Sequence, residues 1–501
     1  MIDPRTPVIV GVGQASQRPA DPGEATEPVE LLHDAAMAAI ADARAGRDLA
    51  IDTIAIADML SWRYPDPGAL LGRKLGQDPK RTVLTTVGGN SPQLLVNYLA
   101  PSIAAGDSNV VLIGGAECVY TRWRAKREPR TELVWTVAED PPCPEVVGDA
   151  RPGSSQYEMA HLAVAPTQVY PLFETALRSA ARRSVDEHQI AISELYEQFA
   201  AVAATNRHAW SRTAYTAEEI RTPSPDNRMV TFPYPKRMCA NIDVDQAAAL
   251  LLCSYEAARD AGVADDRMVF PFAGADAHDH YFFSERWSLA DSPGIAAAGS
   301  AALAAADLGI DDIARFDLYS CFPSAVQIAM GALGLGGPAA GDARPLTVTG
   351  GLAYAGGPGN NYVTHSIASM VEACRDDPGS VGLVTALGWY VTKHAVGLYS
   401  SEPRQGFAAA DPAAVQAGID ATPARETAGA YSGRATLEAT SVNFERDGTP
   451  GHAIVAALTP DGRRVLANSR DPETMLSMSE QAWEGRDVTI STDGQSNSLE
   501  A

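Results

Sequence analysis

The side chains best suited to nucleophilic or metal chemistry are few and widely spaced in this 501-residue chain. None of the six cysteines belongs to a CxxC pair, and their irregular spacing argues against a disulfide framework and a zinc cluster. The six are Cys118, Cys143, Cys239, Cys253, Cys321 and Cys374. The nine histidines form no HExxH pair. His278-Asp279-His280 resembles a metal clip without an evident third ligand, so we expect a solvent-exposed loop there and predict no metal site.

Two glycine turns are better placed to bind a ligand. Gly88-Gly89-Asn90 precedes Ser91 and Pro92, which suit the N-cap and first position of a helix. A similar turn at 355–360 contains Gly356-Gly357-Pro358. Unpaired N–H groups at such helix starts can bind a phosphate or a thioester oxygen, so we expect both turns to line one pocket. The predicted ligand-binding residues are Gly88, Gly89, Asn90, Gly356, Gly357, Asn360 and Gly388.

The elements around the two turns follow the same order, with a strand before the turn and a helix and a buried strand after it. Residues 82–87, 93–105 and 110–113 form the first copy, and residues 346–349, a helix through Val371 and residues 381–384 form the second. Two copies about 270 residues apart indicate an internal duplication. Further alternation, with strands at 7–15 and 51–57 and a helix at 28–44, predicts an α/β fold with crossover helices.

The remaining segments predict an insertion and an added domain. Residues 122–156 are rich in charge, proline and glycine and favour an excursion loop, and 166–210 have the apolar spacing of two helices. Short alternating strands after residue 430, joined by Asp-Gly turns, predict a small β-barrel that resembles an OB fold. The predicted units are 1–120, the first half; 121–235, a helical loop domain; 236–400, the second half; 401–429, a linker with one short helix; and 430–501, the barrel.

The segments 103–117, 238–252, 317–325 and 350–359, in this order and spacing, resemble the thiolase superfamily. They are most similar to sterol-carrier-type thiolases and to thiolase-like proteins with an added carboxyl-terminal domain. The resemblance covers about residues 5–400. It implies a duplicated, layered αβαβα fold with two mixed sheets, an acetyl-CoA acetyltransferase-like ancestry in lipid metabolism, and CoA or acyl-CoA as the ligand, with no tightly bound cofactor.

The same resemblance assigns thiolase chemistry to four positions, and all four have changed. The nucleophilic cysteine matches Gly89, the histidine that activates it matches Gly357, and the acid/base cysteine matches Ala386. The residue that orders an oxyanion-hole water matches Tyr319, in Tyr319-Ser320-Cys321-Phe322. Because thiolysis and Claisen condensation need a thiolate with its base and a proton donor, we predict no standard thiolase activity.

Other side chains near these positions leave alternatives open. Tyr319 is a candidate general acid or base, because some thiolase-like proteins without the cysteine resemble retro-aldolases with an OB-type partner; a tyrosine packed into vacated space is the competing interpretation. Cys321 is a weaker candidate, since packing explains it as well. His365 fits a helix face, and Lys393-His394 fits either a surface role or contact with an acyl or phosphate group. Three functions follow: an acyl-CoA-binding protein, an aldol-type lyase, or a structural partner subunit.

Charge narrows the choice of partners. The 39 basic and 62 acidic side chains give a net charge of −23, which repels nucleic acid and anionic membranes. The one dense basic run, Arg122-Trp123-Arg124-Ala125-Lys126-Arg127 with Arg130, fits a solvated loop or a phosphate contact. No apolar run reaches the roughly 18–20 residues of a membrane span, and no secretory signal is evident, so we expect a cytoplasmic protein.

The sequence also predicts a monomer or a weak homodimer. Family dimers pair near residues 82–87, and here Pro79-Lys80-Arg81 precedes that strand. Proline and cations at a sheet edge discourage pairing with another chain. We expect residues 430–501 to pack against the thiolase-like body in place of a partner subunit; the competing interpretation is the ordinary family dimer with the barrel outside it.

Overall fold

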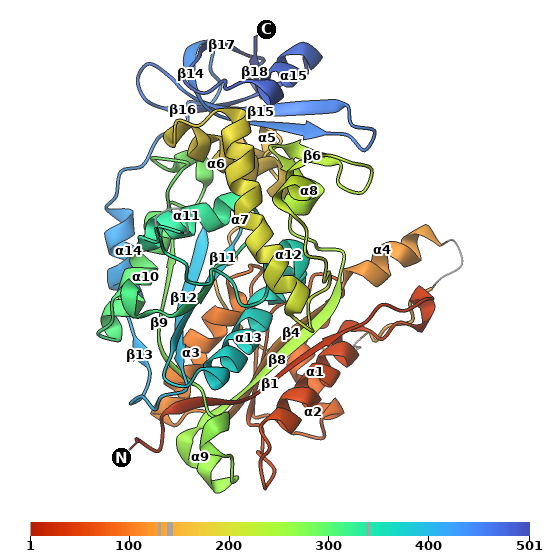
Figure 1. The fold of residues 1–501 in the computed structure, drawn as a ribbon, viewed down its shortest axis with the longest axis vertical. Coiled ribbons are helices and arrows are strands. Elements are labelled where there is room, and N and C mark those ends of the chain that lie inside the picture. Colours follow the sequence, from red (N-terminus) through yellow and green to blue (C-terminus); the bar gives the residue numbers. More distant parts are fainter. Residues whose placement is uncertain (1, 129–131, 138–143, 338–340, 501) are drawn as a thin grey trace.

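The computed structural model describes residues 2–128, 132–137, 144–337 and 341–500. Figure 1 shows a two-sheet body, with a small barrel at the end opposite the amino terminus. Cys143 and Arg130 lie outside the described residues.

Within these ranges, the first sheet has six strands in the order β1-β8-β4-β2-β3-β5. They are β1 (Pro7–Ser16), β2 (Thr53–Ile56), β3 (Arg81–Thr85), β4 (Val110–Cys118), β5 (Glu145–Val147) and β8 (Asp245–Ser254). β1, β8 and β4 pair antiparallel, whereas β4, β2, β3 and β5 run parallel. Every residue of β4 and β8 is buried, because helices cover both faces of the sheet.

The second sheet repeats this mixture of directions in the order β10-β11-β12-β9-β13. Its strands are β9 (Phe270–His278), β10 (Arg315–Asp317), β11 (Val381–Gly388), β12 (Lys393–Ser400) and β13 (Ala408–Ala409). β10 and β11 are parallel, and β11, β12 and β9 are antiparallel.

Helices α3 (Ser91–Ala105) and α13 (Tyr362–Asp376) lie between the two sheets and contact strands of both (Figure 1). Helices α1 (Pro28–Asp42) and α2 (Pro67–Lys74) cover the outer face of the first sheet. Helix α10 (Pro293–Ala305) covers the outer face of the second, and α11 (Pro323–Leu333) packs on α10. The layered αβαβα fold predicted from the sequence is confirmed. Short helices α9 (Tyr255–Asp260) and α12 (Gly351–Tyr354) join these layers.

The strand predicted at 346–349 is wrong. Two backbone hydrogen bonds join the start of this segment to β10 and the residue after it. The N–H of Phe316 donates to the carbonyl of Pro345, and the N–H of Leu318 donates to the carbonyl of Leu346. The carboxylate of Asp317 then accepts from the backbone N–H groups of Val348 and Thr349, at 2.9 and 3.1 Å. A side chain therefore takes the donors that a strand ladder would use, and the chain turns towards Gly350.

The insertion contains more regular structure than the sequence indicated. The two helices expected at 166–210 are α6 (Pro166–Ala180) and α7 (Val185–Thr205). The segment 122–156 was expected to be an excursion loop, but it holds most of helix α4 (Val119–Arg127) and strand β5. The other elements are α5 (Gln156–Ala160), α8 (Ala217–Arg221), β6 (Met229–Phe232) and β7 (Tyr234–Pro235).

Strand β5 covers the sheet edge at which family dimers were expected to pair. It lies parallel to β3, outside it, with Leu84 opposite Val146. Arg81 was expected to discourage strand pairing at this edge; instead its guanidinium donates to both carboxylate oxygens of Glu145 on β5, at 2.8 and 3.0 Å. The chain thus uses its own strand to pair with β3.

The barrel after residue 430 is confirmed as a closed five-stranded barrel. Its strands are β14 (Gly433–Phe444), β15 (Pro450–Leu458), β16 (Arg464–Ser469), β17 (Asp487–Thr492) and β18 (Asn497–Leu499), with helix α15 (Pro472–Glu480). Closure follows because β14 pairs with β15 and also with β17. Before the barrel, α14 (Pro412–Asp420) packs on α10 and β9, so residues 408–420 follow the second sheet closely.

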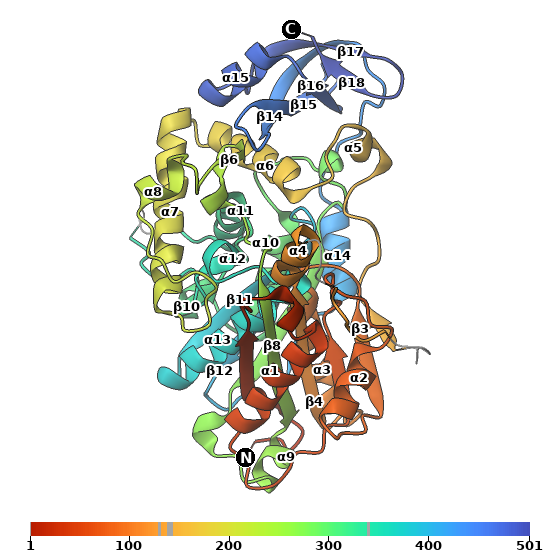
Figure 2. The same cartoon turned by 90° about the vertical axis from the view of Figure 1, so that its right-hand side faces the viewer.

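Figure 2 shows the barrel next to the inserted helices α5 and α6. Buried polar contacts attach it to the insertion and to the body. The side chain of Arg464 is fully buried, donates to both carboxylate oxygens of Glu438 at 2.7 Å, and also donates to backbone carbonyls of the body, including that of Ser284 at 3.1 Å. Arg178 of α6 pairs with Glu484 of the barrel. Strand β14 also pairs with β6, which extends the barrel sheet into the insertion. We call these contacts the barrel seam.

No helix in the described ranges is long and apolar enough to cross a membrane. No group of three or more His, Cys, Asp or Glu in this part of the chain is arranged to hold a metal ion. The prediction of a solvent-exposed loop at 278–280 is wrong for Asp279. Asp279 is buried and accepts hydrogen bonds from His394, at 2.8 Å, and from the backbone of Gly294.

Candidate functional site

A cleft of about 710 Å³ lies between the inserted helices and the two-sheet body. The insertion contributes lining residues at 165–167, 211, 215, 226 and 230, and the body contributes residues 236, 237, 239–243, 319, 321, 322, 352–354, 357 and 359. Tyr319, Cys321 and Gly357, all singled out from the sequence, line this cleft. The resemblance to thiolases therefore identified part of the lining of this cleft.

The sequence missed two cations that line the same cleft, Lys236 and Arg237. The Arg237 guanidinium lies over the ring of Tyr215, 4.2 Å from its centroid, and Asp226 and Asp243 also line the cleft. The available signal was the Pro-Lys-Arg-Met run that precedes the 238–252 segment. Two cations next to apolar and aromatic walls suit a ligand with both phosphate and apolar parts.

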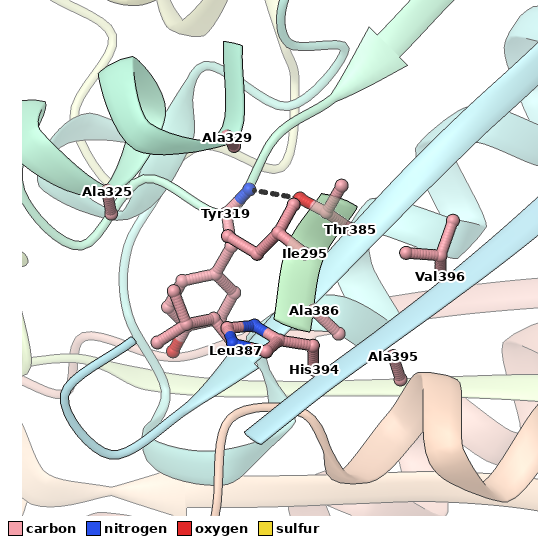
Figure 3. A pocket seen from close by; sticks show the side chains of 10 residues that line it. All are labelled: Ile295, Tyr319, Ala325, Ala329, Thr385, Ala386, Leu387, His394, Ala395 and Val396. Carbon is pink, nitrogen blue, oxygen red and sulfur yellow. Dashed lines mark hydrogen bonds between the residues drawn. The ribbon is translucent and has the colours of Figure 1, made fainter. Parts of the chain in front are cut away.

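Tyr319 forms the inner end of this cleft. It follows strand β10, and its backbone N–H donates to the hydroxyl of Thr385 at 2.9 Å (Figure 3). Its ring packs edge-on against Tyr362, with 5.6 Å between the centroids. Behind it lies a second cavity of only about 10 Å³, also lined by Tyr319 and by Ala386, Thr385 and His394. A space of this size holds about one water molecule.

The position of the thiolase nucleophile has no room for a side chain. A Cβ built on Gly89 would overlap the Tyr319 hydroxyl, and would lie 2.8 Å from Tyr319 Cζ and 2.5 Å from the Leu387 carbonyl oxygen. Gly89 and Ala386 do not line the large cleft. We expected Gly89, Gly357 and Ala386 to line one pocket, but only Gly357 lines the cleft. Tyr319 fills the space next to Gly89.

The two glycine turns do come together, as the duplication implied. The backbone N–H of Gly88 donates to Asn360 Oδ1 at 2.9 Å, and Asn360 in turn donates to the carbonyl of Asp58. Asn90 lies against Gly388, where a Cβ built on Gly388 would be 2.5 Å from Asn90 Oδ1. Gly88, Asn90, Asn360 and Gly388 are buried and Asp58 is half-buried, and none of these residues lines the large cleft.

The second turn reaches the cleft through Gly357 and Gly359, whereas Gly356 packs against Gln246. The N–H groups of the two glycines that reach the cleft are paired within the protein, contrary to the expectation from the sequence. The N–H of Gly357 donates to the Asn241 carbonyl at 2.8 Å, and that of Gly359 donates to the Gly357 carbonyl. Since Gly88 is also paired, these turns act as structural links between segments.

Burial holds the two candidate catalytic groups in their protonated forms. It raises the pKa of the Tyr319 phenol well above its ordinary value, and the nearby Cys321 adds to that effect. Burial likewise raises the pKa of the Cys321 thiol to about 12, partly opposed by a hydrogen bond with Tyr170. Neither group is poised as a base or a nucleophile near neutral pH.

Three other ionisable candidates are buried away from the cleft. His365 lies on α13, bonds Gln14 Oε1 through Nδ1 at 2.7 Å, and has its pKa lowered to about 3 by burial and by His208. Lys393 donates to the carbonyls of Val87 and Asp149, at 2.6 and 3.1 Å, so the surface role considered for Lys393-His394 is wrong. Lys393 instead ties β12 to the first glycine turn.

The comparisons with known proteins agree with this geometry. Residues 414–495 match the domain family described as "Thiolase-like protein type 1 additional C-terminal domain". A crystal structure of a monomeric SCP2-thiolase like protein type 1 from Mycobacterium smegmatis is 35% identical, with all of both chains covered and a TM-score of 0.85. The chain belongs to the SCP2-thiolase-like protein type 1 family. The predicted membership of the thiolase superfamily with an added carboxyl-terminal domain is confirmed.

Other thiolase-fold structures resemble this SCP2-thiolase-like protein at lower identity. A structure described as "Ltp2-ChsH2(DUF35) aldolase" is 19% identical, with 80% of this chain and 99% of the other covered and a TM-score of 0.60. An acetyl-CoA acetyltransferase from Syntrophomonas wolfei is 16% identical, with 80% and 100% covered and a TM-score of 0.57. These two show the shared fold. Among proteins of curated function, no sequence match to this chain was found.

Proposed function

We propose that this SCP2-thiolase-like protein binds CoA or an acyl-CoA in the large cleft, without thiolase turnover, and serves acyl-CoA metabolism in the cytoplasm. The supporting observation is the cleft itself, of about 710 Å³, with Lys236 and Arg237 in its walls and Tyr319, Cys321 and Gly357 at the inner positions. The cations suit the phosphates of CoA, and the aromatic and apolar walls suit its pantetheine and acyl parts.

The absence of turnover follows from the groups at the inner end. Gly89, Gly357 and Ala386 offer no nucleophile, base or acid, and burial keeps the Cys321 thiol protonated. Without a thiolate and a proton acceptor, neither acyl transfer nor carbon–carbon bond formation has its first step. We therefore expect no acetyl-CoA acetyltransferase activity.

A thermal-shift titration with CoA and acetyl-CoA, followed by product analysis, tests this proposal. At 100-fold excess over Kd, ligand binding adds roughly 2.7 kcal/mol to stability. The K236A/R237A double variant should lose most of that shift, whereas R434A, which removes an exposed barrel arginine, should keep it. The proposal fails if no shift occurs, or if the double variant retains it. Cleavage of acetoacetyl-CoA by CoA would overturn the absence of turnover.

The second candidate is an aldol-type lyase acting on an acyl-CoA, with Tyr319 as the acid/base group. Two observations favour it: Tyr319 lines the cleft, and a structure with the same fold is described as an aldolase. The test is to measure the release of a carbonyl compound from β-hydroxyacyl-CoA thioesters. The wild type should release it, and Y319F should not. The raised pKa of Tyr319 suits a proton donor better than a base.

We also propose that the chain is a monomer. β5 occupies the outer side of β3, and the 35% identical relative is described as monomeric. Light scattering at micromolar concentration should give the mass of one 52.8 kDa chain. A tight dimer would reject this proposal, and a stable complex with a second protein would favour the structural-subunit function.

A further inference from the structure

Tyr319 belongs to the walls of two separate cavities. It lines both the large cleft and the cavity of about 10 Å³. No other residue is shared by the two linings. Figure 3 shows the tyrosine ring among the side chains that line the inner cavity, which are small or apolar apart from Thr385 and His394.

The space behind the ring is apolar and nearly filled. Ala325, Ala329, Ala386 and Ala395 contribute only methyl groups to its lining. The remaining volume of about 10 Å³ is that of one water-sized group, so an alkyl chain that reached Tyr319 could not continue past it. On the Gly89 side, the Tyr319 hydroxyl already occupies the position of an added Cβ.

We propose that Tyr319 closes the inner end of the cleft and thereby limits the protein to thioesters of short acyl groups. This inference rests on the proposed binding of acyl-CoA in the cleft. Tyr319 then acts as a specificity-determining residue through its volume, while its hydroxyl takes no part in bond making. Replacing the ring by a methyl group would join the cleft to the space bordered by the alanines and admit a longer chain.

The barrier itself can be tested without any ligand, by labelling a cysteine placed behind it. Ala386 lines the inner cavity and does not line the cleft, so A386C puts a thiol on the far side of Tyr319. We expect methyl methanethiosulfonate to label A386C slowly and A386C/Y319A at least about tenfold faster, as followed by peptide mass spectrometry. A386C/Y319F, which keeps the ring, should stay slow. Fast labelling of A386C alone overturns the barrier, as does equal labelling of all three folded variants.

Chain-length selectivity is measured by the affinities for acetyl-, butyryl-, hexanoyl- and octanoyl-CoA, with free CoA as reference. The wild type and Y319F should bind octanoyl-CoA at least about tenfold more weakly than acetyl-CoA, a difference of about 1.4 kcal/mol. Y319A should remove that difference and leave free CoA within about twofold. Y319S serves if Y319A does not fold.

The two possible failures are distinguishable. If the wild type binds neither CoA nor any thioester, the proposed function fails, and the labelling experiment still decides whether Tyr319 is a barrier. If CoA binds but octanoyl-CoA binds the wild type as tightly as acetyl-CoA, the restriction to short acyl groups is wrong. The restriction is also wrong if Y319A shows the same dependence of affinity on acyl-chain length as the wild type.

Discussion

The former catalytic centre and the barrel seam are both buried, yet they are built from opposite kinds of residue. At the centre, Gly89, Gly357 and Ala386 carry no ionisable group, and the space is closed by one tyrosine. At the seam, Arg464 and Arg178 are held by carboxylates and by backbone carbonyls with little or no exposure to water.

The difference shows where the molecule tolerates change. A buried charge that loses its partner destabilises the folded protein, so a change of one residue in a seam ion pair requires a change of the other. At the centre, Gly89, Gly357 and Ala386 carry no ionisable side chain, so the constraint that packing imposes there is one of volume. The barrel is therefore held by paired charges, whereas the centre is held by close packing.

The largest expected effect is at the seam. R464A leaves Glu438 without its partner and should destabilise the chain by about 3–5 kcal/mol in urea denaturation. The neighbouring R463A removes an arginine whose side chain is 37% exposed and pairs only with Asp461, so its effect should stay within about 0.5 kcal/mol. Equal effects of the two variants would show that the seam adds no more stability than a surface ion pair.

A smaller effect is expected at the centre from an added methyl group. G89A should cost about 1–3 kcal/mol, because its Cβ meets Tyr319 and the Leu387 carbonyl. G89A/Y319F should recover part of the loss, since the hydroxyl is removed while the carbonyl stays. In the control G331A the added Cβ meets nothing within 4 Å in helix α11, so stability should stay the same or rise slightly. A neutral G89A would mean that the centre has free space.

Most of the fold could be predicted from the sequence, and the two exceptions have physical reasons. The glycine turns, the strands at 82–87, 110–113 and 381–384, and the closed barrel come from local patterns, and these were predicted correctly. β5 escaped prediction because three residues in a polar segment carry almost no periodicity, and the strand at 346–349 failed because Asp317, distant in sequence, takes its donors.

The candidate site was only partly predictable for the same reason. Tyr319 and Cys321 were found through a motif, but nothing local to Tyr319 shows that its hydroxyl occupies the side-chain position of residue 89. Lys236 and Arg237 were missed because they join the cleft only once the insertion folds over the body. Volume and pairing between distant segments are properties of the packed chain.

A pH dependence of stability is expected from Lys393, the amine beside the first glycine turn. Burial lowers its pKa from 10.5 to about 8, partly opposed by Asp149. Between these values the unfolded chain binds the proton and the folded chain does not, so this lysine makes stability rise with pH from about 8 to 10.5. Urea denaturation at pH 7, 9 and 10.5 should show the wild type gaining stability relative to K393M. A constant difference would mean that the amine has an ordinary pKa.

The pairing of β6 with β14 has a consequence for how the chain is made. Phe232 leaves the ribosome about 210 residues before its partner Val442. At a synthesis rate of roughly 5–20 residues per second, the paired strands β6 and β7 have one edge unpaired for about 10–40 s. During that interval the nascent chain exposes a strand edge that can pair with other chains, so truncation before residue 433 should promote aggregation during synthesis rather than release a soluble two-sheet body.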